Sequence, residues 1–101
     1  MSKTTVLIVE DDAGLREALV DTLLLADYQV VAADSAEQAI MMLGRQPVDI
    51  VVSDIQMGEM NGLALLKAIK AKDANLPVLL MTAYATIDDA VQAMRDGATD
   101  Y

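Results

Sequence analysis

Acidic side chains stand where two apolar segments of the chain end. Glu10 and Asp11 follow an apolar run at 6–9, and Asp54 follows another at 48–53. If the two segments lie side by side, these three carboxylates converge, and they repel one another unless a cation joins them. A donor set of oxygens alone favours a hard cation such as Mg²⁺, which leaves room for a phosphoryl oxygen. The pattern therefore predicts a Mg²⁺ site beside which Asp54 can attack phosphorus.

Simpler roles exist for the same residue types. Acidic residues at the start of a helix often act only as caps and dipole partners, worth about 0.3–1 kcal/mol, and we assign Asp12 to this role. Thr82 ends a further apolar run, where its hydroxyl could bond a phosphoryl oxygen or simply satisfy the strand end. Three carboxylates at strand ends favour the site over capping alone.

The composition excludes several kinds of chemistry. The 101 residues contain no cysteine and no histidine, which removes disulfides, Cys/His zinc sites, thiol catalysis and histidine bases. A net charge of −9 repels phosphate backbones, so we expect no direct binding of nucleic acid. The apolar run at 6–9 is far too short to span a bilayer. We therefore expect a cytoplasmic protein that does not enter the membrane.

Short apolar runs alternate with stretches of helical period. Strands are predicted at 6–9, 28–33, 48–53 and 78–82, and helices begin after the cap residues Asp12, Ser35, Asn61 and Thr86. Gly44 and Gly97 suit the ends of two of these helices. The helix faces expected to point inward are Leu15, Ala18, Leu19, Thr22, Leu23 and Ala26; Ala36, Ala39, Ile40 and Leu43; Leu63, Leu66 and Ile69; and Ile87, Ala90, Val91 and Met94.

This alternation predicts an α/β fold with a parallel sheet that helices cover on both faces. Right-handed crossovers make such a sheet doubly wound. Ligands of these sheets bind outside the carboxyl ends of the strands, where the strand order switches. Glu10, Asp11 and Asp54 stand at such ends.

Ordered motifs along the chain resemble the receiver domain of two-component response regulators. They are the apolar run that ends in Glu10-Asp11-Asp12, Ser53-Asp54 with Met57, Met60-Asn61-Gly62, Met81-Thr82-Ala83, and Gly97-Ala98-Thr99-Asp100-Tyr101. The likeness covers essentially the whole chain and is nearest to receivers of NtrC-type, sigma-54-dependent activators. It implies a flavodoxin-like sheet with strand order 2-1-3-4, followed in the family by a fifth strand.

The resemblance implies roles for the acidic residues. Asp54 would be the phospho-acceptor. Asp11 would bind Mg²⁺ directly, Glu10 would act mainly through water, and Gln56 would offer its backbone carbonyl to the metal. The protein would then be a signalling module and not an enzyme in the usual sense.

The resemblance also implies a switch and shows two departures. Thr82 would be the switch hydroxyl and Tyr101 the switch aromatic. Gly58 stands where the family usually has proline, and the family's lysine, fifth strand and last helix would follow Tyr101. We therefore interpret residues 1–101 as one receiver domain that is incomplete at its C-terminus. Without the lysine we expect Mg²⁺ binding but poor phosphorylation, and without the fifth strand we expect the edge at 78–82 to pair with a second copy.

Three functions follow from these residues. The leading hypothesis is a module that accepts a phosphoryl group on Asp54 from a sensor histidine kinase and switches a surface for transcriptional control through an output domain or target protein. A Mg²⁺-dependent aspartyl-phosphate phosphatase is the alternative enzyme, although Gln56 occupies the place of its general acid. A phosphorylation-independent interaction module is the third.

Overall fold

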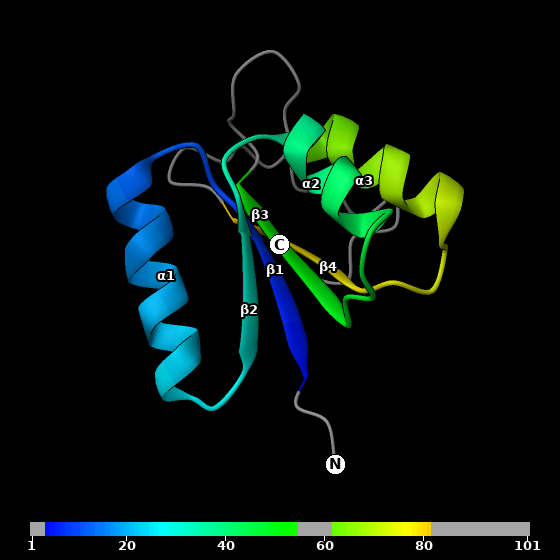
Figure 1. The fold of residues 1–101 in the computed structure, drawn as a ribbon. Helices are drawn as coiled ribbons and strands as arrows, with labels where there is room; N and C mark the ends of the chain where they lie inside the picture. Colours follow the sequence, from blue (N-terminus) through cyan, green and yellow to red (C-terminus); the bar gives the residue numbers. More distant parts are fainter. Residues whose placement is uncertain (1–3, 55–61, 82–101) are drawn as a thin grey trace.

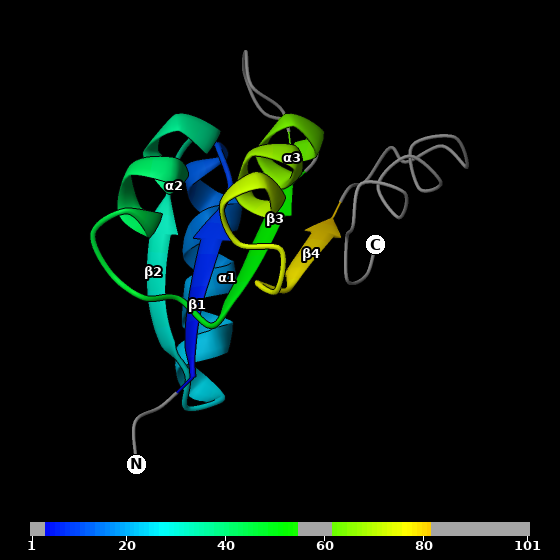
Figure 2. The ribbon, with the colours of Figure 1, turned by 90° about the vertical axis from the view of Figure 1, so that its right-hand side faces the viewer.

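The computed structural model describes residues 4–54 and 62–81. The order of elements is β1 (Thr5–Val9), α1 (Ala13–Leu25), β2 (Gln29–Ala33), α2 (Ala36–Leu43), β3 (Ile50–Asp54), α3 (Gly62–Lys72) and β4 (Val78–Met81). The strands form one parallel sheet in the order β2-β1-β3-β4, with β1 between β2 and β3 (Figure 2). α1 lies on one face of the sheet, and α2 and α3 lie on the other (Figure 1). The predicted fold class and strand order are confirmed.

The strand register brings the acidic residues together. Val9 of β1 is paired with Ser53 of β3, so the residues that follow, Glu10 and Asp54, are neighbours at the carboxyl end of the sheet. The backbone N–H of Glu10 also bonds the carbonyl of Ala33 in β2. The two central strands therefore place Glu10 and Asp54 at the predicted switch point.

The core lies mainly between the sheet and the α2–α3 layer. Leu7 and Val9 of β1 and Val51 of β3 are fully buried and belong to the same apolar cluster as α2 and α3. In α3, the prediction holds for Leu66 and Ile69, and Leu65 is fully buried as well although the expected face omitted it. Among the described residues, no helix is long and apolar enough to cross a membrane.

Helix α1 departs from the expected buried stripe. Only Leu19 and Leu23 of that stripe are half-buried; Ala18, Thr22 and Ala26 are exposed, and Leu15 is 48% exposed. The periodicity identified the side of the helix that faces the sheet but not how much of that side is covered. In the described part of the chain, α1 is the only helix on its face of the sheet, so its flanks receive no cover from a neighbouring helix.

The N-terminal cap of α2 agrees with the prediction from the sequence, whereas the conformation at its C-terminal end does not. The Oγ of Ser35 accepts the N–H of Gln38 at 3.1 Å, and the side chain of Gln38 accepts the N–H of Asp34. Gly44 ends the helix with a φ of −76°, so the left-handed freedom of glycine is not used there. A left-handed residue does follow α1, and it is Asp27, with a φ of 71°.

The element boundaries differ from the predictions by a few residues. β2 begins at Gln29 and not at Tyr28, and β3 spans Ile50–Asp54 and not 48–53. β4 is described as Val78–Met81. The cap at Asn61, the last helix with its cap Thr86, and the apolar positions of that helix lie outside the described residues.

Candidate functional site

Three carboxylates meet at the carboxyl end of the sheet. Glu10 and Asp11 follow β1, Asp54 ends β3, and one carboxylate oxygen of each lies within 4.8 Å of those of the other two. Glu10 is buried, Asp54 is half-buried and Asp11 is exposed. The site is thus enclosed by protein at Glu10 and open to solvent at Asp11. The predicted convergence of these three residues occurs.

Burial makes the negative charge of the Glu10 carboxylate energetically unfavourable. Glu10 is 1% exposed, and within the described residues its Oε1 has no hydrogen-bond partner. Its Oε2 accepts the backbone N–H of Asp12 at 3.0 Å. Burial raises the pKa of Glu10 to about 7, and the carboxyls of Asp11 and Asp54 act in the same direction, whereas the Asp12 N–H opposes them. A cation at this place would favour the charged form of Glu10 and so oppose the shift in its pKa.

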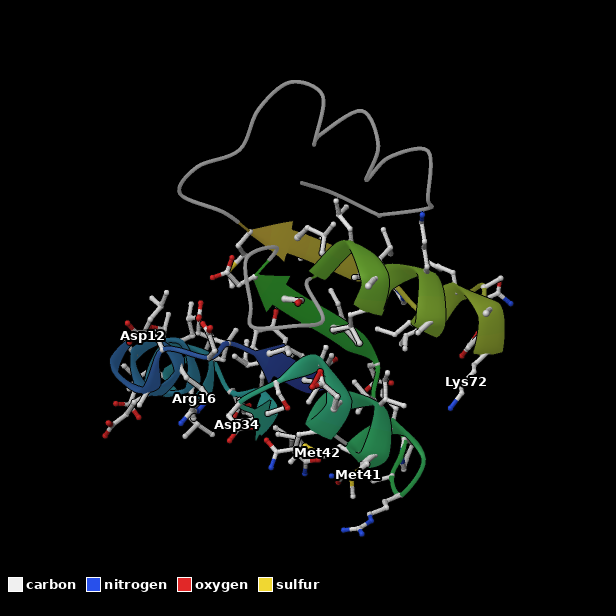
Figure 3. The ribbon with its side chains drawn as sticks, turned by 90° about the horizontal axis from the view of Figure 1, so that it is seen from above. Asp12, Arg16, Asp34, Met41, Met42 and Lys72 are labelled. Atoms are coloured by element: carbon white, nitrogen blue, oxygen red, sulfur yellow. The ribbon has the colours of Figure 1, made fainter. Side chains whose placement is uncertain are left out.

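The loop that carries the acidic pair is fixed by α1. The Oδ1 of Asp12 accepts the N–H of Leu15 at 3.0 Å, which confirms Asp12 as the helix cap. The guanidinium of Arg16 donates to the carbonyl of Glu10 at 2.9 Å, and Arg16 is half-buried. Figure 3 shows Asp12 and Arg16 at the start of α1. Arg16 was not predicted as a site residue. The only indication in the sequence is that this basic side chain follows the acidic pair by about one and a half helical turns.

The backbone of Asp54 is held by its neighbours. It pairs in the sheet with Met81 of β4, and the buried Ser53 donates its hydroxyl to the Asp54 carbonyl at 3.0 Å. The carboxylate therefore projects from a fixed point. Ser53 is a second supporting residue that sequence reasoning missed, because a serine in an apolar strand carries no signal of its own.

The other predicted site residues lie outside the described residues. They are Gln56, the expected backbone ligand, Thr82, the expected switch hydroxyl, and Tyr101, the expected switch aromatic.

The residues present fit a magnesium ion. The donor set consists of carboxylate oxygens only, which suits a hard cation. The Oε1 of Glu10, which has no hydrogen-bond partner in the described part of the chain, is a buried acceptor that requires a proton or a cation. The exposed Asp11 leaves the site open to an incoming anion.

Comparison with known families agrees with this geometry. Residues 6–101 match the sequence model of the response regulator receiver domain. The chain belongs to this family. A receiver domain is a signalling module that accepts a phosphoryl group, and it is not a classical enzyme; the family binds Mg²⁺ at an acidic pocket.

Curated relatives of this receiver domain are response regulators and transcriptional regulatory proteins. It is 55% identical over 96 residues to the response regulator protein FleR of Pseudomonas aeruginosa, an alignment that covers 95% of this chain and 20% of FleR. It is 42% identical over 96 residues to the transcriptional regulatory protein ZraR of Escherichia coli, covering 95% of this chain and 22% of ZraR. The chain thus spans about a fifth of the length of these relatives. The expected likeness to NtrC-type activators is confirmed.

Solved structures support the same fold. A response regulator receiver protein from Pseudomonas putida matches with a TM-score of 0.94 and 31% identity, covering 100% of this chain and 85% of that one. The response regulator TrrA of Thermotoga maritima, solved in complex with Mg²⁺–BeF, matches with a TM-score of 0.89 and 26% identity, covering 97% of this chain and 84% of TrrA.

Proposed function

We propose that this receiver domain accepts a phosphoryl group on Asp54 from the phosphohistidine of a sensor histidine kinase, in a Mg²⁺-dependent reaction. The observation that carries the proposal is the approach of three carboxylates to within 4.8 Å, one of them buried with an oxygen that no described residue bonds. Without a cation, such a cluster destabilises the fold. The cluster therefore does not serve the stability of the fold, and we attribute its position at the switch point to the binding of a cation.

Four groups would hold the metal. They are the carboxylates of Glu10, Asp11 and Asp54 and the backbone carbonyl of Gln56, with Glu10 acting mainly through water. When bound, Mg²⁺ supplies positive charge that offsets the repulsion between these carboxylates and the oxygens of an incoming phosphoryl group. The Mg²⁺–BeF complex of the related TrrA supports this choice of metal.

Asp54 would act as the nucleophile. One of its carboxylate oxygens forms a bond to phosphorus while the bond from phosphorus to the histidine nitrogen breaks, and the electron pair of that bond stays on the imidazole. The sheet pairing with Met81 and the hydroxyl of Ser53 fix the backbone from which Asp54 attacks. Arg16 holds the backbone of Glu10 in the same way.

The acyl phosphate would then bias a two-state surface. We assign Thr82 as the hydroxyl that moves onto the phosphoryl group and Tyr101 as the aromatic side chain that follows it. The proposed partners are the kinase and an output domain or target protein that controls transcription, in the cytoplasm. The name of ZraR, a transcriptional regulatory protein, supports transcriptional control as the output.

Labelling with acetyl phosphate, in a chain extended through the fifth strand of the family, tests the acceptor. Incorporation of phosphate should require Mg²⁺ and disappear in Asp54→Asn. Asp12→Asn is the matched control, because it makes the same chemical change two residues beyond Glu10 while asparagine caps a helix as well as aspartate. Equal labelling of Asp54→Asn and the unmodified sequence would refute the assignment. Multiple turnover on phosphate monoesters would support a phosphatase instead.

Self-association is a second part of the proposal. β4 is at one end of the described sheet, and its residues Val78–Met81 are apolar. We propose that this edge, extended to Thr82, pairs with a second copy. Sedimentation should show dimers, and Leu79→Lys should weaken them; a monomer at high concentration would contradict this.

A further inference from the structure

The ammonium group of Lys70 bonds the loop that joins α3 to β4. Its Nζ donates to the carbonyl of Leu76 at 2.6 Å and to that of Ala74 at 3.3 Å. Lys70 is half-buried, whereas Lys67 and Lys72 of the same helix are exposed. Ordering a lysine side chain costs conformational entropy, and hydrogen bonds from a charged donor are strong enough to offset that cost. Lys70 therefore holds the loop against the end of α3.

Further bonds fix the loop at both of its ends. The N–H of Asp73 donates to the carbonyl of Ile69 at 2.8 Å. Leu76 is 9% exposed and belongs to the main apolar cluster. Pro77 has no N–H to give to the sheet, but its carbonyl accepts the N–H of Val51 in β3 at 3.0 Å. The carbonyls of Leu76 and Pro77 thus anchor the two residues immediately before β4, one to α3 and the other to β3.

β4 leads from this anchor to the acidic site. Its last residue, Met81, pairs with Asp54 of β3, and the next residue in the sequence is Thr82, which we assign as the switch hydroxyl. β4 has four residues, so at about 3.3 Å per residue its ends are about 13 Å apart. In the described sheet β4 pairs with β3 alone (Figure 2). A change in where β4 begins should therefore alter the position of Met81 beside Asp54.

We propose that Lys70 is a positioning residue for phosphoryl transfer to Asp54, because it fixes the point at which β4 begins. This inference rests on the proposed function and adds a residue to it. Lys70 bonds the loop before β4, whereas Asp54 lies beside the other end of that strand, so the effect passes through the backbone of β4. Glu10 and Asp11 follow β1, which lies on the far side of β3 from β4. We therefore expect the affinity for Mg²⁺ to change little when Lys70 is replaced.

Amide hydrogen exchange tests whether Lys70 holds β4, in the chain extended through the fifth strand of the family. In Lys70→Met the amides of Val78–Met81 should exchange about tenfold faster, as expected for the loss of a hydrogen bond to a charged group. Lys70→Arg can still donate to both carbonyls and should restore most of the protection. Lys72→Met is the matched control, since it makes the same chemical change at an exposed lysine of α3. Unchanged exchange of β4 in Lys70→Met, or an equal increase in Lys72→Met, would overturn the proposal.

Labelling of the same extended chain with acetyl phosphate tests the effect on the acceptor. At saturating acetyl phosphate and Mg²⁺, Lys70→Met should incorporate phosphate about threefold more slowly, because Asp54 is less often in the productive geometry. The Mg²⁺ concentration at half-saturation should stay the same, and Lys70→Arg should recover the rate. Ser35→Ala controls for stability, since it removes the cap of α2 and should label normally. A normal rate in Lys70→Met, or an equal loss in Ser35→Ala, would refute the positioning role.

The same measurements separate this inference from the proposed function. If labelling is lost in Asp54→Asn but is normal in Lys70→Met, the positioning role of Lys70 is wrong and the proposed function stands. If labelling is normal in Asp54→Asn, the proposed function is wrong, whatever the exchange of β4 shows.

Discussion

Replacing Glu10 with glutamine should make the protein more stable at neutral pH. Burial and the neighbouring carboxyls raise the pKa of Glu10 from 4.5 to about 7 in the folded state. Below pH 4.5 the carboxyl is protonated in both states. Between the two values the unfolded chain loses the proton while the folded chain retains it, so the free energy of unfolding falls as pH rises. Glutamine is neutral at every pH in this interval, so the free energy of unfolding of Glu10→Gln does not fall for this reason.

The magnitude follows from the shift in pKa. The interval from 4.5 to about 7 corresponds to about 3 kcal/mol, at about 1.4 kcal/mol per pH unit. The stability of Glu10→Gln relative to the unmodified sequence should therefore rise by about 3 kcal/mol between acidic and mildly alkaline pH. The amide oxygen of glutamine can still accept the N–H of Asp12, so the loop keeps its hydrogen bond.

Urea unfolding at a series of pH values measures this difference. Glu17→Gln is the matched control, because it makes the same chemical change at an exposed position of α1 and should leave the pH dependence unaltered. Millimolar Mg²⁺ should stabilise the unmodified sequence near pH 8 and have a much smaller effect on Glu10→Gln. A stability difference that does not change with pH, or an equal response of both proteins to Mg²⁺, would refute the reasoning.

Other residues give further predictions. Arg16→Ala should lower Mg²⁺ affinity about tenfold in calorimetric titrations, because its bond to the Glu10 carbonyl is lost; Arg16→Lys should recover part of the affinity, and equal losses would count against a positioning role. Leu66→Ala should destabilise the fold by about 2–5 kcal/mol in urea unfolding, since Leu66 is fully buried. The same change at the exposed Leu25 should have little effect. Ser35→Ala should lower the free energy of unfolding by about 1 kcal/mol through loss of the α2 cap, whereas Ser35→Asp should not.

Local features could be predicted because they depend on residues that are close in the sequence. Ser35 and Asp12 cap their helices as expected, since each bonds an N–H three residues later. The alternation of apolar runs with helical periods is also a pattern of residues close in the sequence, and it predicted the parallel sheet. The resemblance to receiver domains supplied the strand order, which no local pattern contains.

Burial depends on elements that are distant in the sequence, and here sequence reasoning was less successful. The apolar stripe of α1 predicted a buried face, but Leu15 is 48% exposed and Ala18 is exposed. Leu65 was omitted from the inner face of α3 and is fully buried. A helix pattern indicates which side is apolar, whereas the neighbouring elements determine how much of that side is covered.

The sequence by itself determined which residues could form a site: oxygen donors only, at the ends of two apolar runs. Their meeting depended on the pairing of β1 with β3, which the tertiary structure decided. The tertiary structure also buried Glu10, with one oxygen that has no partner at 4–54 or 62–81, and brought Arg16 and Ser53 against the backbone of the site. The physical reason is that side-chain chemistry belongs to each residue, whereas burial and distance arise from long-range packing.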